Sequence, residues 1–306
     1  MALTVDPNLP EYTRVDGVAG SIKSVGSDTL NNLMTLWQEG FTRFYPSAQM
    51  EIEGKGSSTA PPALIEGTAA FGPMSRPMKD TEISDFESKF GYPPTGVRTA
   101  IDVLAIYVHK DNPIKELTLQ QVDAIFSITR KAGYPSEVRT WGDLGLTGEW
   151  ADKPISLYGR NSASGTYGFF KEHALSNGDF KNSVKEQIGS SSVVQGVASD
   201  RYGIGYSGIG ARTADVRAVP LAFASGEPAI EAVAEHAYDG TYPLTRFLLV
   251  YVNYKPESEL DPLRREFIRY ILSRQGQSDV LKGEYIPVTE EVAHAELESV
   301  GIGHAH

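Results

Sequence analysis

The segment P-I-S-L-Y-G-R-N-S-A-S-G-T-Y-G-F-F, residues 154–170, contains the structural unit that decides the fold. Its first five residues predict a strand, and apolar residues recur at helical spacing from its last residues onward. The turn between strand and helix carries Arg160 and the run Ser164, Gly165 and Thr166. A helix start leaves backbone N–H groups unpaired and carries a partial positive charge. Hydroxyls and a guanidinium at this turn therefore predict a site for an anion.

The same unit occurs twice nearer the N-terminus. Residues 21–25 predict a strand, and the polar turn 27–29 is expected to cap the helix that follows. Residues 49–53 predict another strand, and the serines of the turn 57–58 precede a short helix whose first turn tolerates two prolines. Repetition of strand, hydroxyl-bearing turn and helix predicts an α/β fold with ligands at the carboxyl ends of strands.

Two long apolar segments, 97–109 and 243–253, bracket the block that contains the first quoted segment. We interpret them as paired strands that cross a hinge between two domains, with the ligand cleft between those domains. The N-terminal residues are rich in Pro, Asp and Gly and show no period, so they predict an extended arm. The predicted division is a discontinuous domain I at 20–103 plus 244–306, domain II at 104–243, and the arm at 1–19.

Composition limits the classes of function. The chain has 306 residues, 41% hydrophobic and 22% charged, which suits two globular domains. Its formal net charge of −11 excludes a global basic surface for nucleic acid or anionic lipid, so any anion must be bound locally. The absence of cysteine excludes disulfides, thiolate metal ligands and a cysteine nucleophile. No apolar run reaches the roughly 18 residues of a membrane helix, so no direct membrane insertion is expected.

Eight motifs occur in an order and spacing that are specific together, although each alone is weak. They are V-G-S-D-T-L, G-K-G-S-S-T, F-G-P-M-S-R-P, V-L-A-I-Y-V-H-K-D-N-P, T-W-G-D-L-G, Y-G-R-N-S-A-S-G-T-Y, Y-G-I-G-Y-S-G and Y-P-L-T-R. Through them the chain, from about residue 20 to 290, resembles the phosphate-binding proteins of the phosphate ABC importer, which have the two-domain periplasmic-binding-protein fold of type II.

The resemblance implies a binding protein and not an enzyme. Such a protein closes two domains around one dehydrated inorganic phosphate and delivers it to a membrane ABC permease through a transient contact. The resemblance also implies a monomer without cofactor or metal. The N-terminus shows no basic region followed by an apolar core, so the chain is either cytosolic or a signal peptide has been removed from it. The resemblance implies the second alternative, with a periplasmic or secreted location.

The resemblance carries the family's ligands over to this sequence position by position. The implied phosphate ligands are Thr29 with the backbone N–H of Leu30, Ser57, Ser75, Arg160, Ser164, Gly165 and Thr166. Arg160 would offer a charge-assisted fork to two phosphate oxygens, and hydroxyls and N–H groups at three helix starts would supply the other donors.

Two departures from the family pattern affect selectivity and orientation. Ser75 stands where many members have an aspartate that accepts the proton of hydrogen phosphate, and Ser162 stands where an aspartate often orients the arginine. Asp28 is a candidate replacement for the proton acceptor, although an aspartate there could equally cap its own helix. Arg76 is interpreted as a candidate rim residue that pairs with an acidic side chain across the cleft.

Three other functions are alternatives to phosphate binding. Ser75 leaves open another oxyanion, such as sulfate or molybdate. A secreted phosphatase with Ser57 or Ser164 as nucleophile is disfavoured, because no histidine or metal-ligand cluster lies near either serine in the sequence. The G-x-G-x-x-G spelling within 202–208 lacks a following helix, so it does not predict a dinucleotide site.

Overall fold

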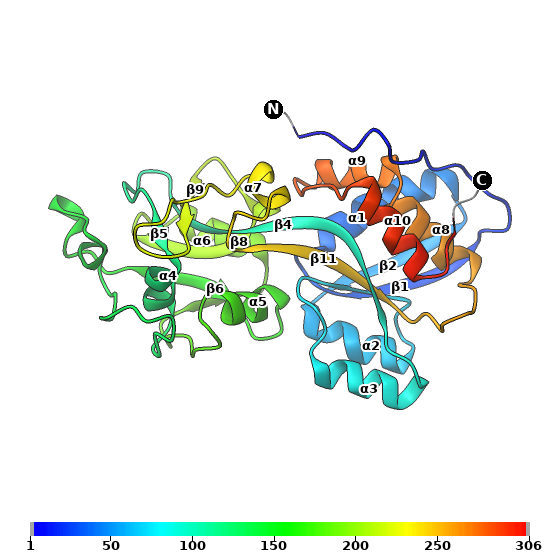
Figure 1. Cartoon of the computed structure of the whole chain (residues 1–306), viewed down its shortest axis with the longest axis horizontal. Helices are drawn as coiled ribbons and strands as arrows, with labels where there is room; N and C mark the ends of the chain where they lie inside the picture. The colour runs from blue at the N-terminus through cyan, green and yellow to red at the C-terminus, as the bar shows by residue number, and fades with distance from the viewer. Residues whose placement is uncertain (1–2, 304–306) are drawn as a thin grey trace. The chain divides into compact units, whose positions relative to one another are not determined.

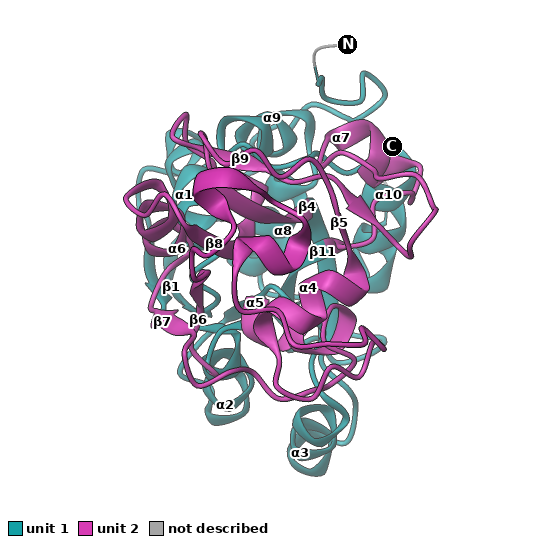
Figure 2. Ribbon diagram, turned by 90° about the vertical axis from the view of Figure 1, so that its left-hand side faces the viewer, with its two compact units in different colours: residues 1–101, 163–165, 247–306 teal, residues 102–162, 166–246 magenta. Residues whose placement is uncertain are grey.

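The computed structural model describes residues 3–303 (Figure 1); His304 and His306, which lie in a polar tail of the sequence, are outside the described residues. The chain divides into two compact units, coloured separately in Figure 2. Unit 1 comprises Met1–Ile101, Ala163–Gly165 and Phe247–His306, and unit 2 comprises Asp102–Ser162 and Thr166–Arg246.

Unit 1 is built on parallel strands with helices on both faces. Its elements are β1 (Gly20–Gly26), α1 (Asn31–Phe44), β2 (Ala48–Gly54), a 3-10 helix (Ser57–Thr59), α2 (Ala60–Glu66), β3 (Phe71–Met74), α3 (Asp80–Phe90), α8 (Pro262–Ile271), α9 (Arg274–Lys282) and α10 (Glu290–Ser299). β1 lies between β2 and β3, parallel to both, and β11 (Thr245–Val252) pairs antiparallel with β3. Figure 1 shows α1, α8, α9 and α10 on one face of this sheet and α2 and α3 on the other.

Helix α1 shows why the sequence forms these layers. Leu33, Met34, Trp37 and Phe41 follow one another at helical spacing and are buried, and each such side chain contributes about 1.5–3 kcal/mol. The Trp37 indole N–H donates to the carbonyl of Gly276 in α9 at 2.8 Å, which satisfies its polar atom. On the other face, α2, α3, β3 and β11 share an apolar cluster that includes Phe86.

Unit 2 has a second sheet. Its elements are β5 (Leu117–Thr118), α4 (Leu119–Phe126), 3-10 helices at Trp141–Leu144, Gly148–Trp150 and Ile209–Ala211, β6 (Ser156–Arg160), α5 (Gly165–His173, whose first residue belongs to unit 1), β7 (Lys185–Gln187), α6 (Ser190–Ala198), β8 (Gly203–Gly208), β9 (Val216–Ala218), β10 (Leu221–Ala222) and α7 (Ala234–Tyr238). β8 pairs parallel with β6 and antiparallel with β4 (Thr95–His109), and β7 pairs parallel with β6.

The two faces of β8 are covered by different helices. Tyr206 stacks on Phe170 of α5, with ring centroids 3.9 Å apart, and contacts Phe126 of α4. The neighbouring Gly205 has no side chain, and a Cβ there would lie 2.8 Å from Val193 of α6. Alternation along the strand thus places α4 and α5 against one face and α6 against the other.

The chain passes between the units within β4 and within β11, which are neighbours in the sheet order. The two apolar segments predicted as paired strands, 97–109 and 243–253, are therefore confirmed as strands. Within residues 3–303, no helix is both long enough and apolar enough to cross a membrane.

One local expectation needs correction. Helix α1 begins at Asn31 and its N-cap residue is Leu30, whose aliphatic side chain accepts no hydrogen bond, so the cap predicted at 27–29 is misplaced. The N-terminal segment 3–19 has no helix or strand, and it packs on the rest of unit 1. Leu9 and Tyr12 are buried, and Arg274 donates to the carbonyls of Leu9 and Pro7.

Candidate functional site

Three serines form a buried hydroxyl cluster in unit 1. Ser27 follows β1 directly, Ser75 follows β3 directly, and Ser57 begins the 3-10 helix after β2. The Ser27 hydroxyl donates to Ser75 Oγ at 3.0 Å, and Ser57 Oγ lies 3.2 Å from Ser75 Oγ. The Ser75 backbone N–H also donates to Ser57 Oγ at 3.0 Å. Because the carboxyl ends of parallel strands meet at one sheet edge, three turns distant in sequence bring their hydroxyls together.

Backbone contacts hold these turns in register. The Ser27 N–H donates to the Pro73 carbonyl at 2.8 Å, and the Gly56 N–H donates to the Gly26 carbonyl at 2.9 Å. A Cβ at Gly26 would lie 2.1 Å from the Pro73 carbonyl oxygen, so the first turn can approach β3 only through glycine. The hydroxyl cluster is thus fixed by main-chain geometry.

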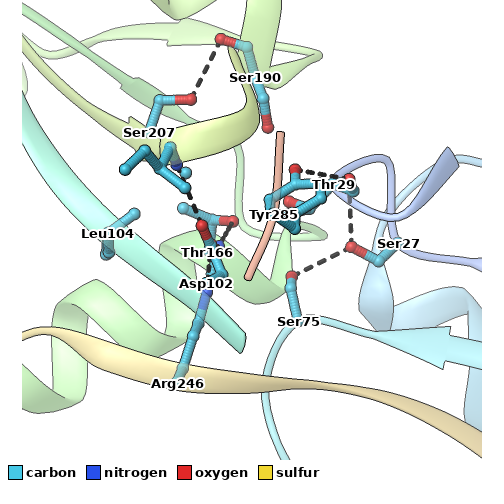
Figure 3. Close-up of polar contacts among 12 residues, drawn as sticks. Ser27, Thr29, Ser75, Asp102, Leu104, Thr166, Ser190, Ser207, Arg246 and Tyr285 are labelled. Atoms are coloured by element: carbon cyan, nitrogen blue, oxygen red, sulfur yellow. Dashed lines mark hydrogen bonds and ion pairs between the residues drawn. The ribbon is translucent and has the colours of Figure 1, made fainter. Parts of the chain in front are cut away.

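The turn that follows β1 places the predicted ligand Thr29 beside Ser27 and Ser75 of this cluster (Figure 3). The Thr29 N–H donates to Ser27 Oγ at 3.1 Å, and its carbonyl accepts from the Tyr285 hydroxyl at 2.9 Å. Both Thr29 and Leu30 are buried, whereas the preceding Asp28 is partly exposed. The Asp28 carbonyl accepts the Asn31 N–H at 3.0 Å, which ties the turn to the start of α1.

Ala163, Ser164 and Gly165 belong to unit 1, although Ser162 before them and Thr166 after them belong to unit 2. The Ser58 N–H donates to the Ala163 carbonyl at 3.1 Å. A Cβ at Gly165 would lie 2.1 Å from Ser57 Oγ and 2.5 Å from Ser75 Oγ. No side chain fits there without displacing these hydroxyls, so glycine is required for this approach.

Arg160 lies in unit 2 at the end of β6 and is 2% exposed. Its Nη1 donates to Ser190 Oγ at 2.9 Å, its Nη2 donates to the Ile188 carbonyl at 3.0 Å, and its backbone N–H donates to the Tyr206 hydroxyl at 3.1 Å. Ser190 begins α6, and its carbonyl accepts the Ser207 hydroxyl at 3.2 Å. These contacts orient the guanidinium without the aspartate that Ser162 replaces.

Thr166 lies in the first turn of α5, in unit 2, where a buried arginine contacts it. Arg246 Nη2 donates to Thr166 Oγ1 at 3.0 Å and to Asp102 Oδ2 at 2.7 Å. Asp102 is in β4 and Arg246 is in β11, so the pair joins the two strands through which the chain passes between units. Figure 3 shows Arg246 extending towards Asp102 and Thr166.

Arg76 is buried and bound within its own unit. Its two terminal nitrogens each donate to an oxygen of Glu82 at 2.8 Å, and one also donates to the Pro77 carbonyl. Burial raises the pKa of Glu82, but the hydrogen bonds from Arg76 and the Lys79 N–H outweigh it and hold that pKa below its ordinary value. The acidic partner of Arg76 is thus Glu82 of its own unit, six residues along the chain, and the role of Arg76 as a rim residue stays a prediction.

The structure thus distributes the predicted ligands over both units. Unit 1 holds Thr29, Leu30, Ser57, Ser75, Ser164 and Gly165, and unit 2 holds Arg160 and Thr166.

Sequence reasoning treated Ser27 only as a cap and missed the roles of Ser190, Asp102 and Arg246. Two of these had a signal: Asp102 and Arg246 are opposite charges beside the apolar runs 103–108 and 247–252, and such charges are buried only when paired. Among the described residues, no group of three or more His, Cys, Asp or Glu side chains could hold a metal ion.

Comparison with known proteins identifies the family of this chain. The PBP superfamily domain matches residues 13–275. The chain is 57% identical to the phosphate-binding protein PstS of Pseudomonas aeruginosa, over 97% of this chain and 92% of that one. It is 30% identical to the protein of the same name from Staphylococcus haemolyticus, over 92% of this chain and 85% of that one.

A solved structure from Clostridium perfringens, a protein with bound phosphate assigned as a phosphate ABC transporter substrate-binding protein, superposes with a TM-score of 0.73. It is 28% identical and covers 88% of this chain and all of that one. The fold and the donor set define the class as a two-domain, type II periplasmic binding protein. Within that class, the chain belongs to the family of the phosphate-binding protein PstS.

Proposed function

We propose that this chain binds inorganic phosphate with high affinity and delivers it to an ABC-type membrane permease. The observation that carries the proposal is the 57% identity, over nearly the whole chain, to a relative named for phosphate binding. The described geometry supports it, because the buried polar groups at the strand ends are hydroxyls, N–H groups and an arginine. These are donors, which an oxyanion needs.

The proposed ligands act as two complementary sets. In unit 1 the hydroxyls of Thr29, Ser57 and Ser75 and the N–H of Leu30 would donate to the anion. In unit 2 the guanidinium of Arg160 would supply charge, and each hydrogen bond between charged groups in a dry site contributes about 1.5–3 kcal/mol. The run Ser164, Gly165 and Thr166 would complete the set at the start of α5.

Binding would act through a conformational change and not through chemistry. We keep the predicted domains, 20–103 plus 244–306 and 104–243, as the proposed moving bodies. A ligand that contacts donors from both bodies stabilises only the state in which both reach it, so phosphate shifts the population towards closure. Transfer to the permease then needs only that the permease favours the open state.

The remaining properties follow from this role. We propose a monomer that works in the periplasm or as a secreted protein, contacts the permease transiently, needs no cofactor, and catalyses no reaction. The hydrogen-bond partners found for Ser57 are Ser75 and its backbone N–H, and neither can act as a general base for a serine nucleophile.

Thermal unfolding of protein stripped of endogenous anion tests the proposal. A ligand that binds only the folded state adds RT ln(1 + [L]/Kd), so about 1 mM phosphate should raise the unfolding midpoint by several degrees. Sulfate and molybdate at the same concentration should not. A chromogenic phosphomonoester should be left intact. Stabilisation by sulfate or molybdate and not by phosphate, or release of product from the ester, would overturn the proposal.

A further inference from the structure

A buried ion pair in unit 2 lies directly behind Thr166. Arg246 donates to Asp102 through Nε at 2.9 Å and through Nη2 at 2.7 Å, and the two side chains are 3% and 0% exposed. The other carboxylate oxygen of Asp102 accepts the Ile209 N–H at 3.0 Å. A buried charge pair of this kind persists only when its hydrogen bonds are satisfied in fixed geometry, so Arg246 has a well-defined position.

Helix α5 fixes the arginine from a second side. The Arg246 guanidinium lies over the ring of Phe169, 5.4 Å from its centroid. Phe169 follows Thr166 by three residues, so both side chains lie on one face of α5. Arg246 is thus held by a strand carboxylate and by the helix that presents the ligand hydroxyl.

The contact between Arg246 and Thr166 has only one possible direction. A guanidinium carries donors and no acceptor, so Thr166 Oγ1 must accept the hydrogen bond. A hydroxyl that accepts this bond can donate its own proton to an acceptor other than Arg246. An oxyanion requires such a donor.

We propose that Arg246, held by Asp102, is a positioning residue for phosphate: it orients the Thr166 hydroxyl as a donor to the anion. The inference rests on the proposed function and adds to it two residues that do not belong to the ligand set. Asp102 offsets the charge of Arg246, so the pair acts through orientation rather than by adding a second full positive charge to the site. This positioning role also gives a function to the Y-P-L-T-R motif, whose last residue is Arg246.

A double-mutant cycle on phosphate affinity tests this role. Arg246→Gln should weaken phosphate binding about tenfold in the otherwise unchanged protein, because one hydrogen bond is lost or misdirected. The same substitution in a Thr166→Val background should change the dissociation constant by less than about twofold, because the hydroxyl through which Arg246 acts is gone. Thr166→Ser, which keeps a hydroxyl, should retain the sensitivity to Arg246→Gln.

Further variants and stability measurements separate an effect on the orientation of Thr166 from a general effect on folding. Arg217→Gln removes another partly buried arginine of unit 2, which donates to the Asn112 carbonyl, and should leave phosphate affinity unchanged. Unfolding midpoints are measured for every variant. Should Arg246→Gln fail to fold, the cycle is run with Arg246→Lys, which keeps a positive charge beside Asp102 but loses the planar fork.

Equal losses of affinity from the Arg246 substitution in both backgrounds would overturn the inference, because Arg246 would then act without Thr166. That outcome would leave phosphate binding itself established. Absence of phosphate binding by the unmodified chain would overturn the proposed function and this inference together.

Discussion

Arg160 is the residue on which anion affinity is expected to depend most. It is buried, and Ser190 with the Ile188 carbonyl holds two of its terminal nitrogens. Ser162 would be too short to orient it as an aspartate does, and the turn before α6 supplies the orienting acceptors instead. The Arg160 guanidinium is therefore already oriented before the anion binds, so its side chain loses little conformational entropy on binding.

Replacing Arg160 by Lys tests this dependence. The ammonium keeps the charge but cannot present a planar fork, so we expect phosphate affinity to fall about 30-fold or more. Arg201→Lys, at an exposed arginine of the same unit that pairs with Glu149, is the matched control and should have no effect. Titration calorimetry on both variants measures the difference. Equal affinities for the Arg160 variant and the unmodified protein would refute the assignment.

Asp28 remains the proposed acceptor for the proton of hydrogen phosphate. The resemblance implies an aspartate at the position of Ser75, and Asp28 adjoins Thr29 in the first turn. Asp28→Asn should reduce the preference for phosphate over sulfate by roughly tenfold, the worth of one hydrogen bond to a charged group. Asp16→Asn makes the same charge change at an exposed position of unit 1. A selectivity ratio that is identical in both variants would show that Asp28 serves only its own helix.

At the scale of elements, the turns matter more than the helices they precede. The turn that ends at Gly165 packs against the hydroxyl cluster of Ser57 and Ser75, and only glycine permits that approach. Gly165→Ala should therefore weaken phosphate binding by at least tenfold, because the new methyl group displaces the donors. Gly283→Ala, in the turn after α9 and outside the ligand set, is the control, because a Cβ there would meet no atom closer than 3.4 Å. Undiminished affinity of the Gly165 variant would mean that this packing is irrelevant to binding.

The loop that follows β3 is held by the Arg76–Glu82 pair, which connects it to α3. The folded pKa of Glu82 is lowered, so its contribution to stability is fully present above its unfolded value of 4.5 and is lost as the pH falls through the folded value. Glu82→Gln should cost about 1–2 kcal/mol at pH 7 and progressively less below about pH 4.

Urea unfolding at pH 7 and below about pH 4 measures the contribution of Glu82 to stability. Glu87→Gln, at an exposed position of the same helix, is the control. A Glu82→Gln penalty that stays constant with pH would contradict this contribution. The loop carrying Ser75 is adjacent, so phosphate affinity should fall together with stability.

The limits of sequence reasoning also appear at this scale. Strands β1, β2 and β6 and the turns after them were predicted because hydrophobic periodicity and hydroxyl residues are local signals. The Ser27–Ser75 bond and the Asp102–Arg246 pair connect positions 48 and 144 residues apart, so no local pattern reports them. The helix start at Asn31 was missed because Ser27 serves another turn instead of its own helix.

For the whole molecule, the central feature is that β4 and β11 carry the chain between its two units. If closure on phosphate is the mechanism, saturating phosphate should lower the radius of gyration of stripped protein in solution scattering, whereas sulfate should not. A variant with Arg160→Lys, which keeps the fold but loses the fork, should show a smaller change at the same phosphate concentration. An unchanged radius of gyration on saturation would rule out closure.

The central claim is that this chain binds phosphate selectively, and calorimetric titration tests it most directly. Protein is freed of endogenous ligand by unfolding and refolding, and phosphate and sulfate are titrated separately. We expect phosphate to give saturable heat that fits one site, and sulfate to give no heat of binding. Binding of sulfate alone, of both anions with similar affinity, or of neither would contradict it, and the first two results would show that Ser75 has changed the ligand.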